Sequence, residues 1–91
     1  MVGDRTTEWP EWWPWEIELS SHLLKRMVDR GFSEIDLRSM MEVATRLRRD
    51  DEPGRWIVET SHASSPWEVI VEPDLEDRLL VVVTAYSVTE L

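Results

Sequence analysis

Residues 79–86, with the sequence LLVVVTAY, constrain the fold of this 91-residue chain more than any other stretch. The run is apolar at odd and even positions alike, so a strand made of it must be covered on both faces or paired on both sides. The other strand candidates alternate apolar with charged residues, as half-exposed strands do. We therefore expect residues 79–86 to form the last element of the chain and an inner strand of its sheet.

The remaining elements follow from periodicity and capping signals. Ser20 and Ser21 offer an N-cap to a first helix that Gly31 ends, and Ser33 with Asp36 resembles a capping box for a second helix. The predicted order is a strand at 15–19, helices at 21–30 and from 33 to about 49, and strands at 55–60, 67–72 and 79–86. We predict an α+β fold of order β-α-α-β-β-β. A helical hairpin packs on one face of a four-stranded antiparallel sheet, with strand order first, fourth, third, second.

The strand pattern divides the sheet into two faces. The residues predicted to pack on the helices are Trp56, Val58, Trp67, Val69 and Val71. The opposite face has isoleucines at its centre and carboxylates around them, contributed by Glu16, Glu18, Glu59, Glu68 and Glu72. This second face is predicted to be open.

A tryptophan- and proline-rich segment, residues 1–14, precedes the predicted domain at 15–91. Together with Trp15 it holds four of the six tryptophans, and its prolines favour extended or polyproline-like backbone. We expect the tryptophans to cap apolar sheet surface or a sheet edge. A stacking platform for bases or a partner's groove is the alternative, and membrane anchoring is disfavoured by the surrounding glutamates.

Composition excludes several classes of function. A formal net charge of -9 argues against nonspecific nucleic-acid binding, which depends on Lys and Arg. The chain has no cysteine, so it has no disulfide framework or thiolate metal site, and this suits a reducing cytoplasm. No signal peptide or membrane span is predicted. No phosphate-binding glycine loop or nucleophile motif occurs, and we expect no cofactor and no metal.

One polar stripe on the first helix is a candidate site. At helical spacing, one side of this helix carries four polar residues, which are His22, Arg26, Asp29 and Arg30. An imidazole beside two guanidinium groups suits phosphate binding and proton transfer. The alternative is an exposed face on which Asp29 pairs with Arg26 or Lys25.

Other polar residues extend or compete with this site. Thr84 and Tyr86 interrupt the last apolar run where a site on the sheet would place hydroxyls. His62 is predicted to lie in a solvated turn. Three arginines, Arg46, Arg48 and Arg49, are expected to end the second helix, where its dipole favours positive charge.

Four stretches in sequence order resemble the bacterial domain of unknown function 4258. They are ELSSHLLKRMVDRGFSE at 18–34, GRW at 54–56, PWEVIV at 66–71 and VVVTAY at 81–86. The similarity spans about residues 15–88, and that family is in turn similar to RelE-like and barnase-like ribonuclease toxins. The resemblance implies the same architecture and metal-independent RNA cleavage.

By motif position the resemblance assigns roles to the candidate residues. His22 would be the acid or base, Arg26 and Arg30 would hold the scissile phosphate, and Thr84 or Tyr86 would sit beside it. The implied partners are RNA and an antitoxin-like protein. The rival hypothesis is a non-catalytic binding module or homodimer that docks through an acidic, tryptophan-rich surface. A small-ligand pocket between the N-terminal segment and the sheet is a third alternative.

Overall fold

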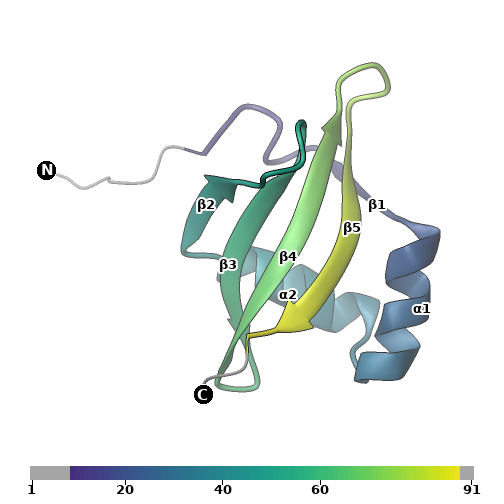
Figure 1. The fold of residues 1–91 in the computed structure, drawn as a ribbon, viewed down its shortest axis with the longest axis vertical. Coiled ribbons are helices and arrows are strands. Elements are labelled where there is room, and N and C mark those ends of the chain that lie inside the picture. Colours follow the sequence, from purple (N-terminus) through teal and green to yellow (C-terminus); the bar gives the residue numbers. More distant parts are fainter. Residues whose placement is uncertain (1–8, 89–91) are drawn as a thin grey trace, which may run out of the picture.

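A computed structural model describes residues 9–88 as an α+β domain built on a five-stranded mixed sheet (Figure 1). The elements are β1 (Glu16–Leu19), α1 (Ser21–Arg30), α2 (Glu34–Glu42), β2 (Arg46–Arg49), β3 (Trp56–His62), β4 (Ser65–Asp74) and β5 (Leu79–Ser87). The strand order is β1-β5-β4-β3-β2, so β5 is an inner strand as predicted, and β1 and β2 are the two edges.

The prediction of four strands was wrong because the second helix is shorter than expected. α2 ends at Glu42, and Arg46–Arg49 forms the additional strand β2 against β3. Ala44 and Leu47 continue the helical spacing of the apolar residues, which is why the helix was extended to about residue 49. The segment pairs as a strand because β3 otherwise has a free edge whose backbone groups need partners.

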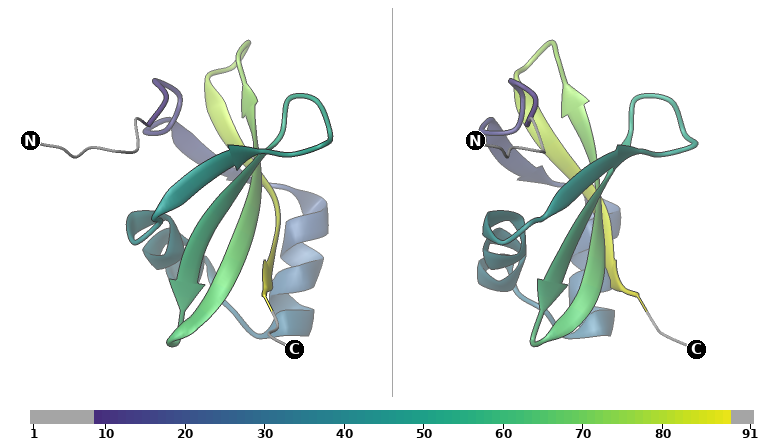
Figure 2. Two further views of the ribbon diagram at one scale, coloured as in Figure 1. Left: turned by 60° about the vertical axis from the view of Figure 1, so that its left-hand side comes forward. Right: turned by 90° about the vertical axis from the view of Figure 1, so that its left-hand side faces the viewer.

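Two further features of the predicted architecture need correction. The sheet is not wholly antiparallel, since β1 runs parallel to β5 while the other neighbours are antiparallel. The helices do not form a hairpin either. α1 lies along β5, and α2 crosses behind β3 and β4, so each helix covers different strands (Figures 1 and 2).

Both helices begin at the predicted caps. The Ser20 side chain accepts a hydrogen bond from the Leu23 N–H and caps α1, which ends at Gly31 in the left-handed conformation. Ser33 and Asp36 form a full capping box at the start of α2. The backbone N–H of Ser33, which donates to the Asp36 carboxylate, lowers the pKa of that group.

One hydrophobic core lies between the helices and the inner face of the sheet. The predicted inner-face residues belong to it: Val58, Trp67, Val69 and Val71 are buried, and Trp56 packs against them. Leu23 of α1 and Leu37, Met40 and Met41 of α2 close it from the other side. Thr60 is buried there too, and its hydroxyl donates to the Met40 carbonyl. Both helices therefore cover the same face.

The tryptophan-rich segment packs on this core, as predicted. Trp12 is buried with its ring centroid 5.5 Å from that of Trp56, and Trp13 and Trp15 pack against the core cluster. The backbone is not extended, however, because hydrogen bonds from the Trp13 and Trp15 N–H groups to the carbonyls of Pro10 and Trp12 fold it into successive turns. Residues 1–8, which also belong to the predicted segment, lie outside the described residues.

The opposite face of the sheet has the predicted apolar centre and charged rim. Ile57 and Ile70 face each other across β3 and β4 and are only 8% and 7% exposed. The side chains around them form ion pairs from one strand to the next, as described below. Among residues 9–88 no helix has the length and apolar character needed to cross a membrane.

Candidate functional site

The C-terminal end of α1 and the second half of β5 enclose a small cavity. It measures about 440 Å³ and is lined by Arg30, Trp67, Tyr86 and Ser87. Arg30 donates hydrogen bonds to the Ala85 carbonyl at 2.7 Å and to the Thr84 hydroxyl at 3.5 Å. We call this cavity, together with Thr84, the α1–β5 site.

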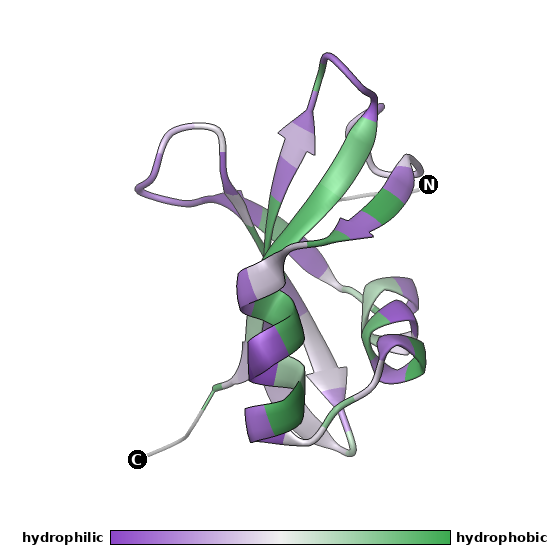
Figure 3. Cartoon of the chain, turned by 90° about the vertical axis from the view of Figure 1, so that its right-hand side faces the viewer, coloured by the Kyte–Doolittle hydropathy of each residue, from purple (hydrophilic) through white to green (hydrophobic). Residues whose placement is uncertain are grey.

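The strand pairing explains why Arg30 reaches this position. β1 is four residues long and covers β5 from Leu79 to Val82, so within residues 9–88 the rest of that β5 edge has no strand beside it (Figure 3). A β-bulge in the β4–β5 pairing lies next to Val82, at the point along β5 where β1 ends. The last turn of α1 contacts the free part of the edge, where the Arg30 guanidinium donates to the partly buried carbonyl of Ala85. The site therefore lies where β1 stops.

Arg26 and His22 lie one and two turns further back on the same side of α1. Four residues of helix rise about 6 Å, so the three side chains form a row about 12 Å long beside β5. Arg26 pairs with Asp29 at 3.1 Å, which confirms the alternative pairing that spacing suggested. Its Nε is buried and has no hydrogen-bond partner within residues 9–88. The His22 side chain is exposed at the first turn.

A chain of polar contacts across the open face reaches the α1–β5 site from the other side. Arg48 of β2 contacts Glu59 of β3 and Glu68 of β4, each at 2.8 Å. The Tyr86 hydroxyl donates to the other oxygen of Glu68 at 2.7 Å. Four adjacent strands are thus linked through their side chains.

These contacts change the acid–base properties of Tyr86 and Arg48. Partial burial, together with the Glu68 carboxylate, raises the pKa of Tyr86 to about 12. The hydrogen bond from Arg48 to Glu59 raises the pKa of the guanidinium. At neutral pH the Tyr86 phenol is protonated, and its proton is donated to Glu68.

The structure brings part of the predicted constellation together. Arg30 contacts Thr84, and Tyr86 lines the same cavity. Within residues 9–88 no hydrogen bond joins His22 or Arg26 to either hydroxyl, so these two residues belong to the site through the shared face of α1 alone. Whether the five residues act on a substrate stays a prediction.

Sequence reasoning missed other members of the site. Trp67 and Ser87 line the cavity, and Glu68 holds Tyr86. Glu68 could have been found from the strand pattern, because it follows the inward Trp67 and must share the open face with Tyr86. Ser87 carries no such signal, since it becomes a neighbour of Trp67 through the register of β4 and β5.

The other polar residues considered for function have structural contacts. His62 ends β3, with its ring edge-on to Trp67 at 5.4 Å. The arginines expected at a helix end lie instead in β2. There Arg49 stacks over Trp56 at 4.7 Å and Arg48 forms the two ion pairs. In the part of the chain that the structure describes, no three histidines, cysteines or carboxylates gather as they would around a metal ion.

Comparison with protein-family models, with curated proteins and with solved structures found no match in any of the three. The resemblance to the domain of unknown function 4258 and to RelE-like toxins therefore stays a prediction from the motifs.

Proposed function

We propose that this protein is a RelE-like, metal-independent endoribonuclease that acts at the α1–β5 site. The observation that carries the proposal is the cavity in which Arg30 and Tyr86 meet, with Thr84 bound to Arg30 and an indole in the wall. A guanidinium and two hydroxyls suit a phosphodiester, and an aromatic wall suits a base. The motif resemblance supports the same assignment.

The reaction needs no cofactor. A base removes the proton from the ribose 2′-hydroxyl, the 2′-oxygen attacks phosphorus, and the bond from phosphorus to the 5′-oxygen breaks as an acid protonates that oxygen. The products are a 2′,3′-cyclic phosphate and a 5′-hydroxyl. His22 exchanges a proton with the substrate, and Arg26 and Arg30 stabilise the pentavalent phosphorane. Tyr86 keeps its proton at neutral pH because of its high pKa, and by donating it to Glu68 it holds its ring in the wall of the cavity beside the phosphate.

The charge distribution favours a short single-stranded substrate. The net charge of -9 weakens binding along an extended nucleic acid, so affinity must come from the few cations on α1. Bases in single strands are free to enter an aromatic-walled cavity, whereas duplex bases are stacked away. The proposed enzyme therefore cuts unpaired RNA and binds duplex weakly.

The test is incubation of the purified protein with an end-labelled single-stranded RNA containing all four bases, with a chelator present, and in parallel with ribosomes. We expect fragments that end in a cyclic phosphate. His22→Ala should lower the cleavage rate about 10²-fold to 10⁴-fold, and Arg30→Ala about 10²-fold to 10³-fold.

Arg46→Ala is the matched control, because it removes an exposed arginine from β2, at the far edge of the sheet. It should cleave at the wild-type rate. Circular dichroism would establish that all variants are folded. Intact RNA with the wild-type protein, or equal product from the wild-type and His22→Ala proteins, would rule out the proposed reaction.

A further inference from the structure

The edge strand β1 leaves part of its backbone without a partner. Within residues 9–88 it pairs with β5 and with no other strand. In a parallel ladder, alternate residues direct their N–H and C=O groups away from the neighbouring strand. A free edge of this kind is a template for one more strand.

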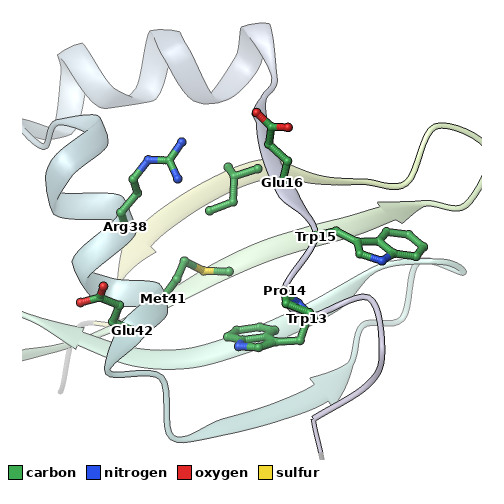
Figure 4. A pocket seen from close by; sticks show the side chains of 8 residues that line it. Trp13, Pro14, Trp15, Glu16, Arg38, Met41 and Glu42 are labelled. Atoms are coloured by element: carbon green, nitrogen blue, oxygen red, sulfur yellow. The ribbon is translucent and has the colours of Figure 1, made fainter.

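A groove lies beside the first half of β1, between the segment that leads into this strand and α2 (Figure 4). It has a volume of about 360 Å³ and is lined by Trp13, Pro14, Trp15, Glu16, Ile17, Arg38, Met41 and Glu42. We call it the β1–α2 groove. In Figure 4 the Trp13 ring and the Met41 side chain form an apolar floor, and Glu16 and Arg38 rise on opposite walls. A strand added to β1 would place its inward side chains over this floor.

The two sides of β1 specify which side chains an added strand should carry. Ile17 and Leu19 pack toward the core, so a neighbouring strand should place apolar residues on that side. Glu16 and Glu18 are exposed on the other side, where a cross-strand neighbour of opposite charge is favoured. The favoured pattern is therefore apolar residues alternating with lysine or arginine.

The other charged residues around the β1–α2 groove also favour a cationic partner. Glu42 is a second carboxylate that lines the groove with Glu16, and Arg38, the one cation among the described lining residues, is paired with Glu34 at 2.8 Å. A second copy of the chain fits poorly through its own β1, since this would bring glutamates of both copies together.

The opposite edge of a second copy is not a ready partner either. The arginines of β2 have the right charge, but Arg48 is held by Glu59 and Glu68, and Arg49 lies over Trp56. Pairing β2 of one copy with β1 of the next would also leave unpaired edges at both ends of the assembly. A partner of different sequence is therefore favoured over self-association.

We propose that β1 and the β1–α2 groove bind an extended segment of another protein, which adds to the sheet as a sixth strand beside β1. Its apolar residues alternate with lysine or arginine residues. The apolar side chains enter the groove and the cations meet Glu16 and Glu18 on the other side of the added strand, while Glu42 adds negative charge at the rim of the groove. This site is separate from the α1–β5 site and does not depend on ribonuclease activity.

The experiment uses two synthetic peptides of identical composition as probes. In one, valine and leucine alternate with lysine. In the other, the same apolar residues form a single block followed by the lysines. Each is titrated into the isotopically labelled full chain, and backbone amide shifts are followed by nuclear magnetic resonance. We expect the alternating peptide to bind about tenfold more tightly, with the largest shifts in β1 and at Met41.

Two double variants with the same change in charge separate docking at the groove from nonspecific electrostatic attraction between the cationic peptide and the acidic protein. Glu16→Lys with Glu42→Lys alters the rim and should weaken binding of the alternating peptide about tenfold. Asp51→Lys with Glu52→Lys alters the exposed loop between β2 and β3, at the opposite edge of the sheet, and the affinity should change less than about twofold. Arg30→Ala should leave peptide affinity unchanged, whatever it does to RNA cleavage.

Four results would overturn the proposal. These are equal weakening by both double variants, shifts centred on Arg46–Arg49 or on the open face, failure of both peptides to bind, and sedimentation showing self-association that protects the β1 amides. The last would make a second copy the occupant. Binding of the alternating peptide with loss of affinity in the rim variant alone would support it.

Discussion

The two edge strands are both four residues long, but they carry opposite charges and have different surroundings. β1 (EIEL) has its glutamates exposed and adjoins an apolar groove. Two of the three arginines of β2 (RLRR) contact groups in the same sheet: Arg48 pairs with two glutamates and Arg49 lies over a tryptophan. Charged side chains that are tied down on an edge discourage a further strand. The comparison teaches that the β2 edge is shielded from a further strand, whereas the β1 edge is open to a strand in which apolar residues alternate with cations.

The largest expected effect concerns the segment that leads into β1. Trp12 is buried against Trp56 of β3, so this segment joins the β1 edge to the part of the sheet next to β2. Trp12→Ala should lower the free energy of unfolding by about 3 to 5 kcal/mol, as for other buried aromatic residues. Urea unfolding measures this. Pro14→Ala, at an exposed position two residues on, should cost less than about 1 kcal/mol.

If Trp12→Ala proved as mild as Pro14→Ala, the segment would not be part of the core. The β1–α2 groove would then lack a fixed wall, because Trp13 and Trp15 of this segment supply much of its lining.

A second prediction tests the junction between β1 and α1. Ser20 caps α1 and also donates from its hydroxyl to the Val83 carbonyl of β5 at 2.9 Å. Ser20→Ala should cost about 1 to 2 kcal/mol. Ser33→Ala removes the cap of α2, which has no such bond to the sheet among the described residues, and should cost about 1 kcal/mol.

Thermal unfolding of the two serine variants gives the difference directly. Equal losses would mean that the Ser20–Val83 hydrogen bond adds nothing at the β1 end of the sheet.

A third prediction tests the shielded edge. Glu59 and Glu68 lie directly opposite each other, and Arg48 is the cation between them. Arg48→Met leaves two like charges facing each other and should cost about 0.5 to 1 kcal/mol, a modest value because the pair is partly exposed. The loss should shrink at high salt, which screens the repulsion. Arg46→Met is the control, and a loss independent of salt would contradict the electrostatic account.

The smallest effect concerns Tyr86, at the β5 end of the chain of contacts that runs from Arg48 through Glu68. Tyr86 is the sole tyrosine, so tyrosinate absorbance reports its titration directly. Its pKa of about 12 lies above the ordinary value of 10, so the folded state holds the proton more tightly than the unfolded state does. This contribution to stability is complete below pH 10 and is lost as the pH rises toward 12.

Glu68→Gln should move the Tyr86 pKa down toward 10 without reaching it, because burial is the larger cause of the shift. Glu72→Gln removes a carboxylate four residues further along β4 that pairs with Arg55, and it should leave the titration unchanged. Identical titration curves for the wild-type and Glu68→Gln proteins would show that Glu68 does not act on Tyr86.

Much of the scaffold could be predicted from local patterns. The α1 boundaries, the caps of both helices and the inward residues of β3 and β4 follow from short-range periodicity. The second helix was extended too far because Leu47 satisfies two patterns: it continues the helical spacing of α2, and it also alternates with Arg46 and Arg48. Only pairing with the edge of β3, the next strand along the chain, favours the second pattern, and neither segment shows this pairing by itself.

The candidate site was predicted less completely, for a related reason. The stripe of His22, Arg26 and Arg30 is a property of one helix and is visible in the sequence. The contact of Arg30 with Thr84 depends on how far β1 extends along β5, and the contact of Tyr86 with Glu68 depends on the register of β4 and β5. Neither quantity is encoded within a single segment.

The sequence by itself determined the caps, the positions of four strands, the two faces of the sheet and the acidic charge, because each depends on neighbours within a few residues. The tertiary structure alone decided that β2 is a strand, that β1 runs parallel to β5, and which arginines are bound to glutamates. These features depend on backbone groups far apart in the chain finding hydrogen-bond partners, so they are settled when the sheet assembles.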